Sequence, residues 1–368
     1  MPNLLAPTGV VAAADCAKRE FVTLQPSKGA FRAPLPAYFG QDLTAVASRL
    51  PQFRAAIGAQ PLVPPVRLDL ITLHNGSIAI GNNADGLIVD EGGRVVRETA
   101  MFTGWQSQQP IDLPRGEAVL DDIFVGFDGA WSNWYHWLCF ALGRSAIAAG
   151  VLGTETRIVL PAYASRRPAG FSEAAWTQSL EAFGFGGRVQ FLPRGLFRAK
   201  TIRLLWTTPN EPTNLTYLDA FHEVFARVRR SLRLRPDLPR RLLLSRGRSG
   251  NPRISVEETA LVEEAASRHG FVPLHLETLD FRGQAEALFN AECVLGVHGA
   301  GMANILFGRD TLRVLELNLK LDRESLLRPW FYLLAYARRQ KYMMLDRDAG
   351  DLSQERLNTA IETLLTSR

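Results

Sequence analysis

The sequence has few cysteines and no hydrophobic run of membrane length. Its three cysteines, Cys16, Cys139 and Cys293, include no CxxC pair, which excludes a disulfide framework and argues against a structural zinc site. Free cysteines favour a reducing compartment. No run of eighteen apolar residues is present, and the first residues lack the positive segment of a signal peptide. From these absences we expect a cytoplasmic protein without a membrane-spanning helix.

Lysine is also scarce. Of the 42 basic residues, 5 are lysine and the other 37 are arginine; the formal net charge is +5. Arginine suits bidentate contacts with phosphate and carboxylate groups, although a codon bias would enrich arginine on the surface in the same way. The basic charge is therefore compatible with a phosphorylated or polyanionic partner and does not identify one.

Composition and periodicity divide the chain into four parts. A loop-rich extension comes first, followed by a part in which strands, hairpin turns and helices alternate. The segment TTPNEPTN is the best candidate linker, because proline, asparagine and threonine are concentrated in it. After it, short apolar strands alternate with helices, which predicts a parallel, doubly wound α/β sheet of the Rossmann type. The predicted parts are an N-terminal extension at 1–60, an acceptor-side α/β domain at 61–207, a nucleotide-binding domain at 215–345 and a C-terminal helix at 346–368.

A loop with two glycines, in the segment LGVHGAGMANILF, lies between a predicted strand and a helix start. Gly299, Ala300 and Gly301 leave room for a ligand against the backbone, and the amides at a helix start favour an anion. The alternative is a tight turn that needs glycine only for its backbone angles. His298 could donate to a phosphate or hold the turn, and Asn304 could bind phosphate or cap the helix.

Two other interpretations of this loop lack their partner motifs. HGAG resembles the oxyanion loop of esterases, but the chain contains no G-x-S-x-G nucleophile elbow. A dinucleotide site requires G-x-G-x-x-G in the first strand–helix unit, whereas this loop lies late in its domain. A phosphate group of a nucleotide-sugar remains the best ligand.

Charged residues at other predicted strand ends fit the same ligand. Arg246 lies just past a strand and Arg253 lies before the next helix, where both could neutralise a diphosphate leaving group. Glu316, at the end of the strand RVLEL, is the candidate for binding the ribose hydroxyls of the nucleoside. Exposed positions without a ligand are the alternative for all three residues.

Four segments together resemble family-61 glycosyltransferases: SNWYHWLCFALGR, SRGRSGNPRISVEE, LGVHGAGMANILF and RVLELN. The resemblance runs from Gly126 to Glu316, with departures at Val256, where the family often has asparagine, and at Met302, where it has leucine. It implies a GT-B-like α/β fold, in which two Rossmann-type domains face a central cleft and the N-terminal one is irregular with extra β-hairpins.

The resemblance also implies a function. The expected reaction is inverting transfer of a sugar from a nucleoside-diphosphate donor, commonly UDP-linked, to a saccharide or glycoconjugate hydroxyl. Neither a metal nor another cofactor is expected to be required. Bacterial relatives take part in capsule and exopolysaccharide assembly, so we expect a role in surface polysaccharide biosynthesis.

Inverting transfer needs a base that accepts the proton of the acceptor hydroxyl. His136, within NWYHW, is the first candidate, because an imidazole exchanges protons near neutral pH. The alternative for His136 is packing among aromatic residues in a helix core. Asp128, in a glycine-containing loop, is the second candidate. The residues expected on the acceptor side are Asn133, Tyr135 and Arg144.

Two rival functions and a membrane contact use other segments. Asp346 and Asp348 could hold a divalent cation, as in metal-dependent transferases. The seven arginines of 225–241 could serve a non-enzymatic polyanion-binding protein, but a nucleic-acid site would need interleaved aromatic residues or a known module, so we expect no nucleic-acid partner. The segment LLRPWFYLLAYARRQKYMML could lie on a membrane surface, which would suit a lipid-linked acceptor and a peripheral position at the inner membrane.

Overall fold

Two large β-sheets organise the chain, and each belongs to its own structural unit. The computed structural model describes residues 4–5, 7–16, 19–26, 31–32, 37–39, 62–63, 65–81, 83–100, 103, 110–163, 171–208, 212–246, 253–318, 330–345 and 352–367. The first unit comprises Met1–Lys28 and Val66–Val224, and the second comprises Gly29–Pro65 and Phe225–Arg368. The structure thus divides the chain differently from the four predicted ranges.

The boundary between the units lies inside helix α5 (Asp219–Arg230) instead of in the linker 207–214. Phe221 in its first half lies against Gly143 of the first unit, where a Cβ on the glycine would come within 3.0 Å of the phenylalanine ring. Phe225 in its second half packs against Phe307 of the second unit, with ring centroids 5.8 Å apart. The division follows these aromatic contacts, which periodicity does not reveal.

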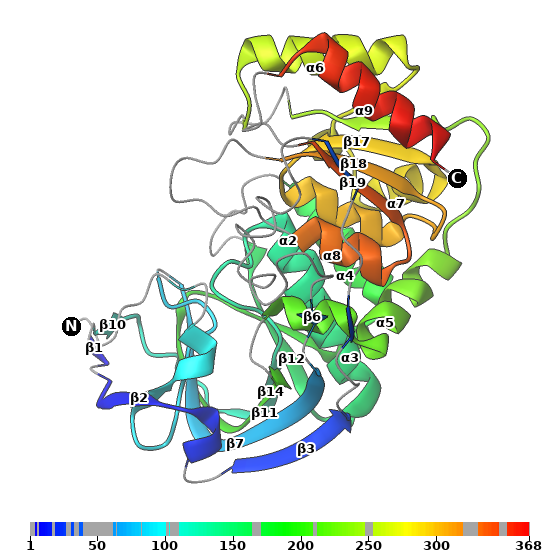
Figure 1. Ribbon diagram of the computed structural model, residues 1–368. Helices are drawn as coiled ribbons and strands as arrows, with labels where there is room; N and C mark the ends of the chain where they lie inside the picture. The colour runs from blue at the N-terminus through cyan, green and yellow to red at the C-terminus, as the bar shows by residue number, and fades with distance from the viewer. Residues whose placement is uncertain are drawn as a thin grey trace. The chain divides into compact units, whose positions relative to one another are not determined.

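The first unit contains a mixed nine-stranded sheet (Figure 1). Its central pair is antiparallel and long: β7 (Arg67–Ile80) pairs with β14 (Gly195–Thr208) over nearly their full lengths. β14 also pairs in parallel with β11, and β11 and its neighbours continue the sheet in parallel. The remaining strands are β2 (Gly9–Val11), β3 (Arg19–Gln25), β8 (Ile88–Val89), β9 (Arg94–Val96), β11 (Leu120–Val125), β12 (Arg157–Pro161) and β13 (Val189–Leu192).

A long apolar helix follows β11 and forms much of the first unit's core. It runs without interruption through α2 (Trp134–His136), a π-helical stretch η4 (Trp137–Leu142) and α3 (Gly143–Val151). All six residues of η4 are buried, which agrees with their apolar character. Helix α4 (Glu173–Phe183) begins at Ser172, whose hydroxyl accepts a hydrogen bond from Ala175 N. Short elements complete this unit: β1 (Leu4–Leu5), η1 (Ala13–Asp15), η3 (Arg97–Ala100), β10 (Ile111–Asp112), η6 (Gly186–Arg188) and η7 (Pro212–Tyr217).

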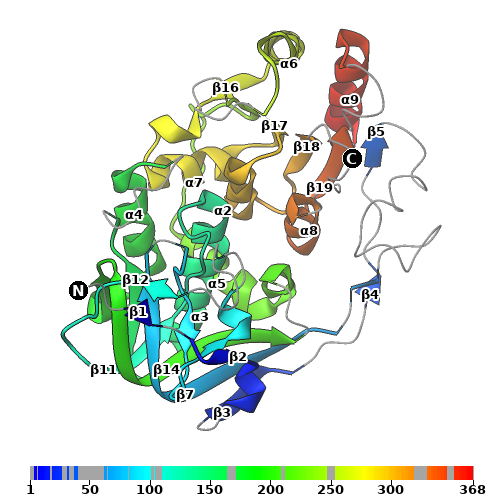
Figure 2. The same cartoon turned by 90° about the vertical axis from the view of Figure 1, so that its left-hand side faces the viewer.

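The second unit contains a six-stranded sheet in which every strand pairing is parallel, as the sequence predicts for this part. The strands follow the order β16–β15–β17–β18–β19–β5, and Figure 2 shows β5 beside β19. Their bounds are β15 (Arg241–Leu244), β16 (Val272–Leu274), β17 (Cys293–Val297), β18 (Arg313–Leu317), β19 (Lys341–Leu345) and β5 (Ala37–Phe39). Numbered along the chain from β15 to β19, this is the order 2-1-3-4-5 of a doubly wound sheet. The chain therefore has a mixed α/β fold with a large parallel sheet.

Helices cover both faces of this parallel sheet (Figure 1). α6 (Val256–Arg268) and α9 (Gln354–Thr366) share one apolar core with it, and α6 begins with a capping box formed by Ser255 and Glu258. The opposite face carries α7 (Phe281–Asn290), α8 (Trp330–Ala337) and the 3-10 helix η9 (Ala300–Phe307). The other elements of the unit are β4 (Phe31–Arg32), β6 (Leu62–Val63) and η8 (Leu276–Thr278).

Arginine side chains close several helix ends, which explains part of the arginine content. Arg188 donates to the carbonyls of Ala149, Leu152 and Gly153 at the end of α3. Arg313 donates in the same way to Leu364 and Leu365 of α9. The carbonyls of a helix C-terminus lack partners within the helix and carry partial negative charge, so a guanidinium satisfies both needs.

The structure can be compared with the sequence on two points, membrane-spanning helices and disulfides. Within the described residues, no helix is both long enough and apolar enough to cross a membrane. Cys16, Cys139 and Cys293 are all buried and form no disulfide.

Candidate functional site

A polar cluster in the first unit joins the two predicted base candidates. His136 Nδ1 lies 3.2 Å from Oδ1 of Asp128, and Arg144 Nη1 lies 3.8 Å from Oδ2 of the same carboxylate. The carboxylate also accepts a hydrogen bond from Ala130 N at 2.9 Å, which fixes its orientation in the loop. The imidazole is 12% exposed, so a small part of it reaches solvent. The structure thus brings together three predicted residues from a seventeen-residue stretch.

The helix start explains where His136 lies. Asn133 caps α2, because its side-chain oxygen accepts a hydrogen bond from Tyr135 N at 3.0 Å. Tyr135 is buried, and its ring meets those of His136 and Phe140 edge-on. Asn133 and Tyr135 therefore hold the start of the helix, which is a different task from the predicted contact with an acceptor. His136 itself lies immediately before the π-helical stretch, a distortion that often accompanies functional sites.

Two glycines allow the Asp128 loop to lie close to its neighbours. A Cβ on Gly126 would overlap the hydroxyl of Ser145 on α3. Gly86 has a φ of +79°, and a Cβ there would lie 3.1 Å from the carbonyl oxygen of Phe127 and 3.3 Å from Cα of Asp128. Glycine at these positions thus lets the loop that carries Asp128 lie close to α3 on one side and to the turn before β8 on the other.

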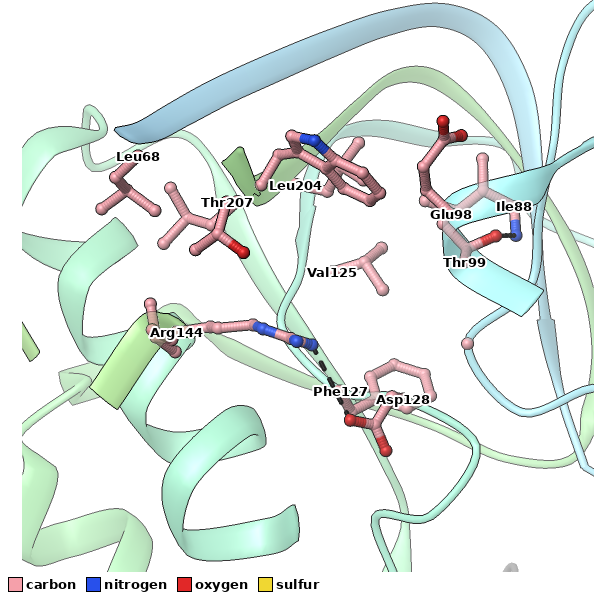
Figure 3. A pocket seen from close by; sticks show the side chains of 14 residues that line it. Leu68, Ile88, Glu98, Thr99, Val125, Phe127, Asp128, Arg144, Leu204 and Thr207 are labelled. Carbon is pink, nitrogen blue, oxygen red and sulfur yellow. Dashed lines mark hydrogen bonds and ion pairs between the residues drawn. The ribbon is translucent and has the colours of Figure 1, made fainter. Parts of the chain in front are cut away.

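A cavity of about 50 Å³ lies beside this cluster (Figure 3). Asp128 and Arg144 line it from one side, and the guanidinium of Arg144 points toward the carboxylate. Burial lowers the pKa of Arg144, and the charge of Asp128 acts in the opposite direction. Such a volume holds a few water molecules. The rest of its wall was not recognised from the sequence, because it comes from separate strands and helices: Leu68, Gly86, Ile88, Glu98, Thr99, Val125, Phe127, Leu204, Leu205, Trp206, Thr207 and Leu215.

The second cluster lies in the second unit, at the carboxyl ends of β15 and β17. In a sheet of order 2-1-3-4-5 these two strands flank the switch point at which ligands bind. Arg246 follows β15, and a Cβ placed on Gly299, which follows β17, would overlap its guanidinium. Arg246 therefore lies directly against the glycine loop. Burial lowers the pKa of Arg246; the charge of Arg253 acts in the same direction and that of Glu277 against it.

The glycine loop presents backbone N–H groups beside Arg246. The first turn of η9 is closed by Met302 N donating to Gly299 O at 2.9 Å. In a 3-10 helix this leaves the N–H groups of Ala300 and Gly301 without partners inside the helix. Two guanidinium groups and these amides concentrate positive charge where the sequence predicts a diphosphate.

His298 and Glu316 form a buried pair between neighbouring strand ends. Nδ1 of His298 hydrogen-bonds Oε1 of Glu316, and the rings of Trp330 and Phe331 lie next to the imidazole. Burial raises the pKa of Glu316, which the interaction with His298 opposes. The prediction that Glu316 contacts ribose does not agree with this structure, because its carboxylate is completely buried and holds the imidazole instead.

Asn304 also has a different place from the one predicted. It is fully buried, and its side-chain amide donates to Oε1 of Gln284 at 3.3 Å and to Gly301 O at 3.0 Å. Gln284 in turn donates to the carbonyls of Leu276 and Leu279. Asn304 thus connects the glycine loop to η8 through α7 and does not point at a ligand.

The predicted metal-binding pair of the alternative, metal-dependent transferase is not part of the structure described above. Asp346 and Asp348 lie outside the described residues. Elsewhere, in the part of the chain that the structure describes, no three His, Cys, Asp or Glu residues are grouped to hold a metal.

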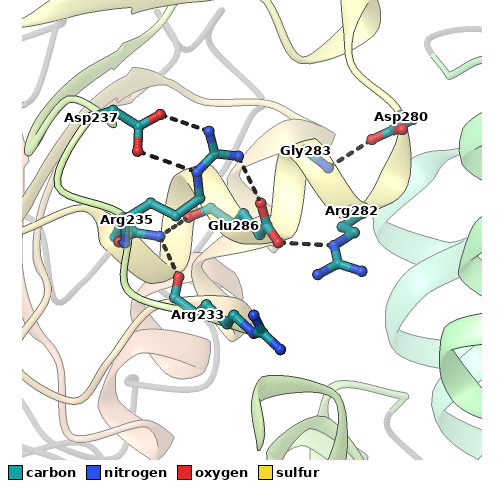
Figure 4. A network of polar contacts seen from close by, with 8 residues as sticks. Arg233, Arg235, Asp237, Asp280, Arg282, Gly283 and Glu286 are labelled. Carbon is teal, nitrogen blue, oxygen red and sulfur yellow. Dashed lines mark hydrogen bonds and ion pairs between the residues drawn. The ribbon is translucent and has the colours of Figure 1, made fainter. Parts of the chain in front are cut away.

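The arginine-rich segment 225–241 is largely engaged within the protein. Arg235 pairs with both Asp237 and Glu286, and Glu286 also binds Arg282 (Figure 4). Two more arginines of this segment donate to helix-end carbonyls, Arg229 to Leu306 O and Arg240 to Asn290 O. These contacts give three of the seven arginines partners within the protein, so the basic segment does not by itself indicate a polyanion.

Doubly wound sheets bind their ligands at the switch point, which is where this chain carries arginines and a glycine loop. Residues 134–315 match the family model described as Glycosyltransferase 61. The protein is therefore a glycosyltransferase. It belongs to glycosyltransferase family 61, which confirms the resemblance found in its four sequence segments.

Comparison with solved structures gives distant similarities. The bacterial iron-containing dodecameric glycosyltransferase TibC from enterotoxigenic E. coli H10407 is 10% identical, with a TM-score of 0.30, and the match covers 82% of this chain and 94% of that chain. The dodecameric iron-containing heptosyltransferase TibC in complex with ADP-D-beta-D-heptose is 9% identical, with a TM-score of 0.30 and coverage of 94% and 98%. No curated protein sequence matches the chain.

Proposed function

We propose that the protein is an inverting glycosyltransferase that takes a sugar from a nucleoside-diphosphate donor, with UDP-sugars as the first class to test. The observation that carries the proposal is the contact of Arg246 with Gly299 at the switch point of the parallel sheet. Arg246, Arg253 and the amides of Ala300 and Gly301 supply positive charge to a leaving diphosphate. Because protein groups can supply this charge, the proposal includes no requirement for a metal.

The first unit supplies the base in this proposal. When Nδ1 of His136 donates to Asp128, the lone pair of the imidazole is on Nε2, which can then accept the proton of an acceptor hydroxyl. Asp128 is then the residue that orients the imidazole and stabilises its protonated form. Arg144 approaches the second oxygen of Asp128 and helps to keep the carboxylate in place.

A GT-B arrangement, in which the donor and acceptor sites face each other, and a role in bacterial surface polysaccharide synthesis belong to the same proposal. Their support is the family membership. The acceptor is proposed to be a saccharide, free or lipid-linked.

A thermal-shift panel tests the donor site. Wild type, Arg246→Ala and the matched control Arg268→Ala, an exposed arginine on α6, would each be heated with UDP, GDP, CDP or ADP, in EDTA and in Mn²⁺. A ligand at about 100 times its Kd stabilises a protein by about 2.7 kcal/mol. We expect one nucleoside diphosphate to stabilise wild type and the control in EDTA, and to lose this effect in Arg246→Ala.

Two outcomes of this panel would contradict the proposal. Stabilisation that appears only with Mn²⁺ would favour a metal-dependent transferase and move attention to Asp346 and Asp348. Folded wild-type protein that responds to no nucleotide would contradict a nucleotide donor altogether.

A further inference from the structure

A histidine and a glutamate follow β16, the strand beside β15 on the side away from β17. Nδ1 of His275 and Oε1 of Glu277 are 3.9 Å apart, which is too long for a direct hydrogen bond. Both atoms are buried, and within the described part of the chain neither has a hydrogen-bond partner. The side chains as a whole are 24% and 29% exposed, so solvent reaches this pair from one side. A buried polar atom without a partner is costly, and a ligand group that fills the gap would remove the cost.

The pair lies against the diphosphate cluster. The charge of Glu277 acts on the guanidinium of Arg246, and the neighbouring Leu276 meets the glycine loop: a Cβ on Gly301 would come within 2.8 Å of its Cδ1. Gln284 fixes this segment by donating to Leu276 O at 3.0 Å. The segment that carries Glu277 is thus fixed through Leu276 at the edge of the site that Arg246 and the glycine loop form.

The place of Glu277 after β16 indicates which part of a nucleotide it would meet. In the dinucleotide-binding form of doubly wound sheets, a phosphate binds in the turn after the first strand and a carboxylate further along the chain binds the ribose; in this chain the glycine loop follows the third strand, and Arg246 follows the first. β15 is the first strand of this sheet and β16 the second. Glu316, at the other candidate strand end, is completely buried and occupied by His298.

We propose that Glu277 binds the ribose hydroxyls of the nucleoside diphosphate and that His275 donates to the same hydroxyl pair. A ribose hydroxyl between the two side chains donates to Oε1 of Glu277 and accepts from Nδ1 of His275. The proposal rests on the proposed function, because it names the residues that hold the nucleoside of the same donor.

Titration calorimetry with ribose analogues tests this inference. The ligands are UDP, GDP and ADP, the 2′,3′-dideoxy form of each, and inorganic pyrophosphate. The proteins are wild type, Glu277→Ala, the isosteric Glu277→Gln and the control Glu264→Ala, which removes an exposed carboxylate on α6. We expect wild type and the control to prefer the ribonucleotide about 10- to 100-fold, the range of a hydrogen bond to a charged group.

In both Glu277 variants we expect this preference to fall to within about 3-fold, while pyrophosphate binds at least as tightly as in wild type, because a negative charge that acts on Arg246 is removed. Retained pyrophosphate binding also shows that the variants are folded. A variant that keeps the wild-type preference for ribose would overturn the inference and leave the proposed function standing. Wild type that binds none of the ribonucleotides would overturn both.

Discussion

The contact between Gly299 and Arg246 predicts that one added methyl group weakens nucleotide binding without unfolding the protein. In Gly299→Ala the new Cβ would occupy the place of the Arg246 guanidinium. The backbone at Gly299 is extended, with φ 172° and ψ 166°, so alanine fits it without strain. The obstacle is the end of a flexible side chain, and the guanidinium can move away at little cost. We therefore expect the free energy of unfolding to change by less than about 1 kcal/mol.

The expected loss of affinity follows from the displaced guanidinium. A hydrogen bond to a charged group contributes about 1.5–3 kcal/mol, so the nucleoside diphosphate should bind about 10- to 150-fold more weakly. Calorimetry would measure the affinity, and urea denaturation would measure the stability. Gly296→Ala is the matched control, for which we expect a loss of stability and no loss of nucleotide affinity. Its Cβ would lie 2.6 Å from Sδ of the buried Met302, so it should lose about 1–3 kcal/mol of stability and keep its affinity when folded.

A double-mutant cycle makes this test sharper. If the methyl group acts by moving Arg246, Gly299→Ala should have no further effect on affinity in the Arg246→Ala background. An equal loss of affinity in both backgrounds would refute the reasoning, because the methyl group would then act directly on the ligand. Wild-type affinity in Gly299→Ala would refute it as well.

Three further predictions follow from the structure. Burial raises the pKa of Glu316, so the folded protein keeps the carboxyl proton to higher pH than the unfolded chain does. The free energy of unfolding should therefore fall as the pH rises above about 4.5, by at most about 1.4 kcal/mol per pH unit. Urea denaturation at several pH values would measure this decrease, which should be absent in Glu316→Gln. His136→Asn should lower kcat about 10²- to 10⁴-fold with unchanged nucleotide affinity, whereas the matched change at the half-buried His74 should not; equal rates for both variants would argue against His136 as the base. Arg313→Ala, which leaves two carbonyls of α9 without their partner, should cost about 1–2 kcal/mol in urea denaturation, against less than about 0.5 kcal/mol for Arg268→Ala; equal costs would contradict the role of Arg313 at the end of α9.

Local sequence signals predicted the elements of the second unit well. The short apolar runs after the predicted linker become strands of a parallel sheet, and helices lie between them. These features depend on neighbouring residues and on a periodicity that can be read directly. The pairing of β7 with β14, and of β5 with β19, joins segments far apart in the chain, and no local pattern specifies such partners.

The candidate site shows the same limit. Asp128 and His136 are eight residues apart, on a loop and the helix after it, so their proximity could be expected from the sequence. The burial of Glu316 could not, because RVLEL would suit an exposed strand end as well; its register beside Gly296 of β17 places it next to His298. His275 and Glu277 were missed, although their position after the second strand of a doubly wound sheet was a usable signal.

The anomeric configuration of the transferred sugar distinguishes an inverting transferase from a retaining one. Wild type would be incubated in EDTA with the sugar derivative of the nucleoside diphosphate that it binds, and proton NMR would record the first anomer of the product formed with a saccharide acceptor or with water. We expect turnover in EDTA and a product whose anomeric configuration is opposite to that of the donor. A product that retains the configuration, or turnover that requires an added divalent metal, would contradict inverting transfer without a metal.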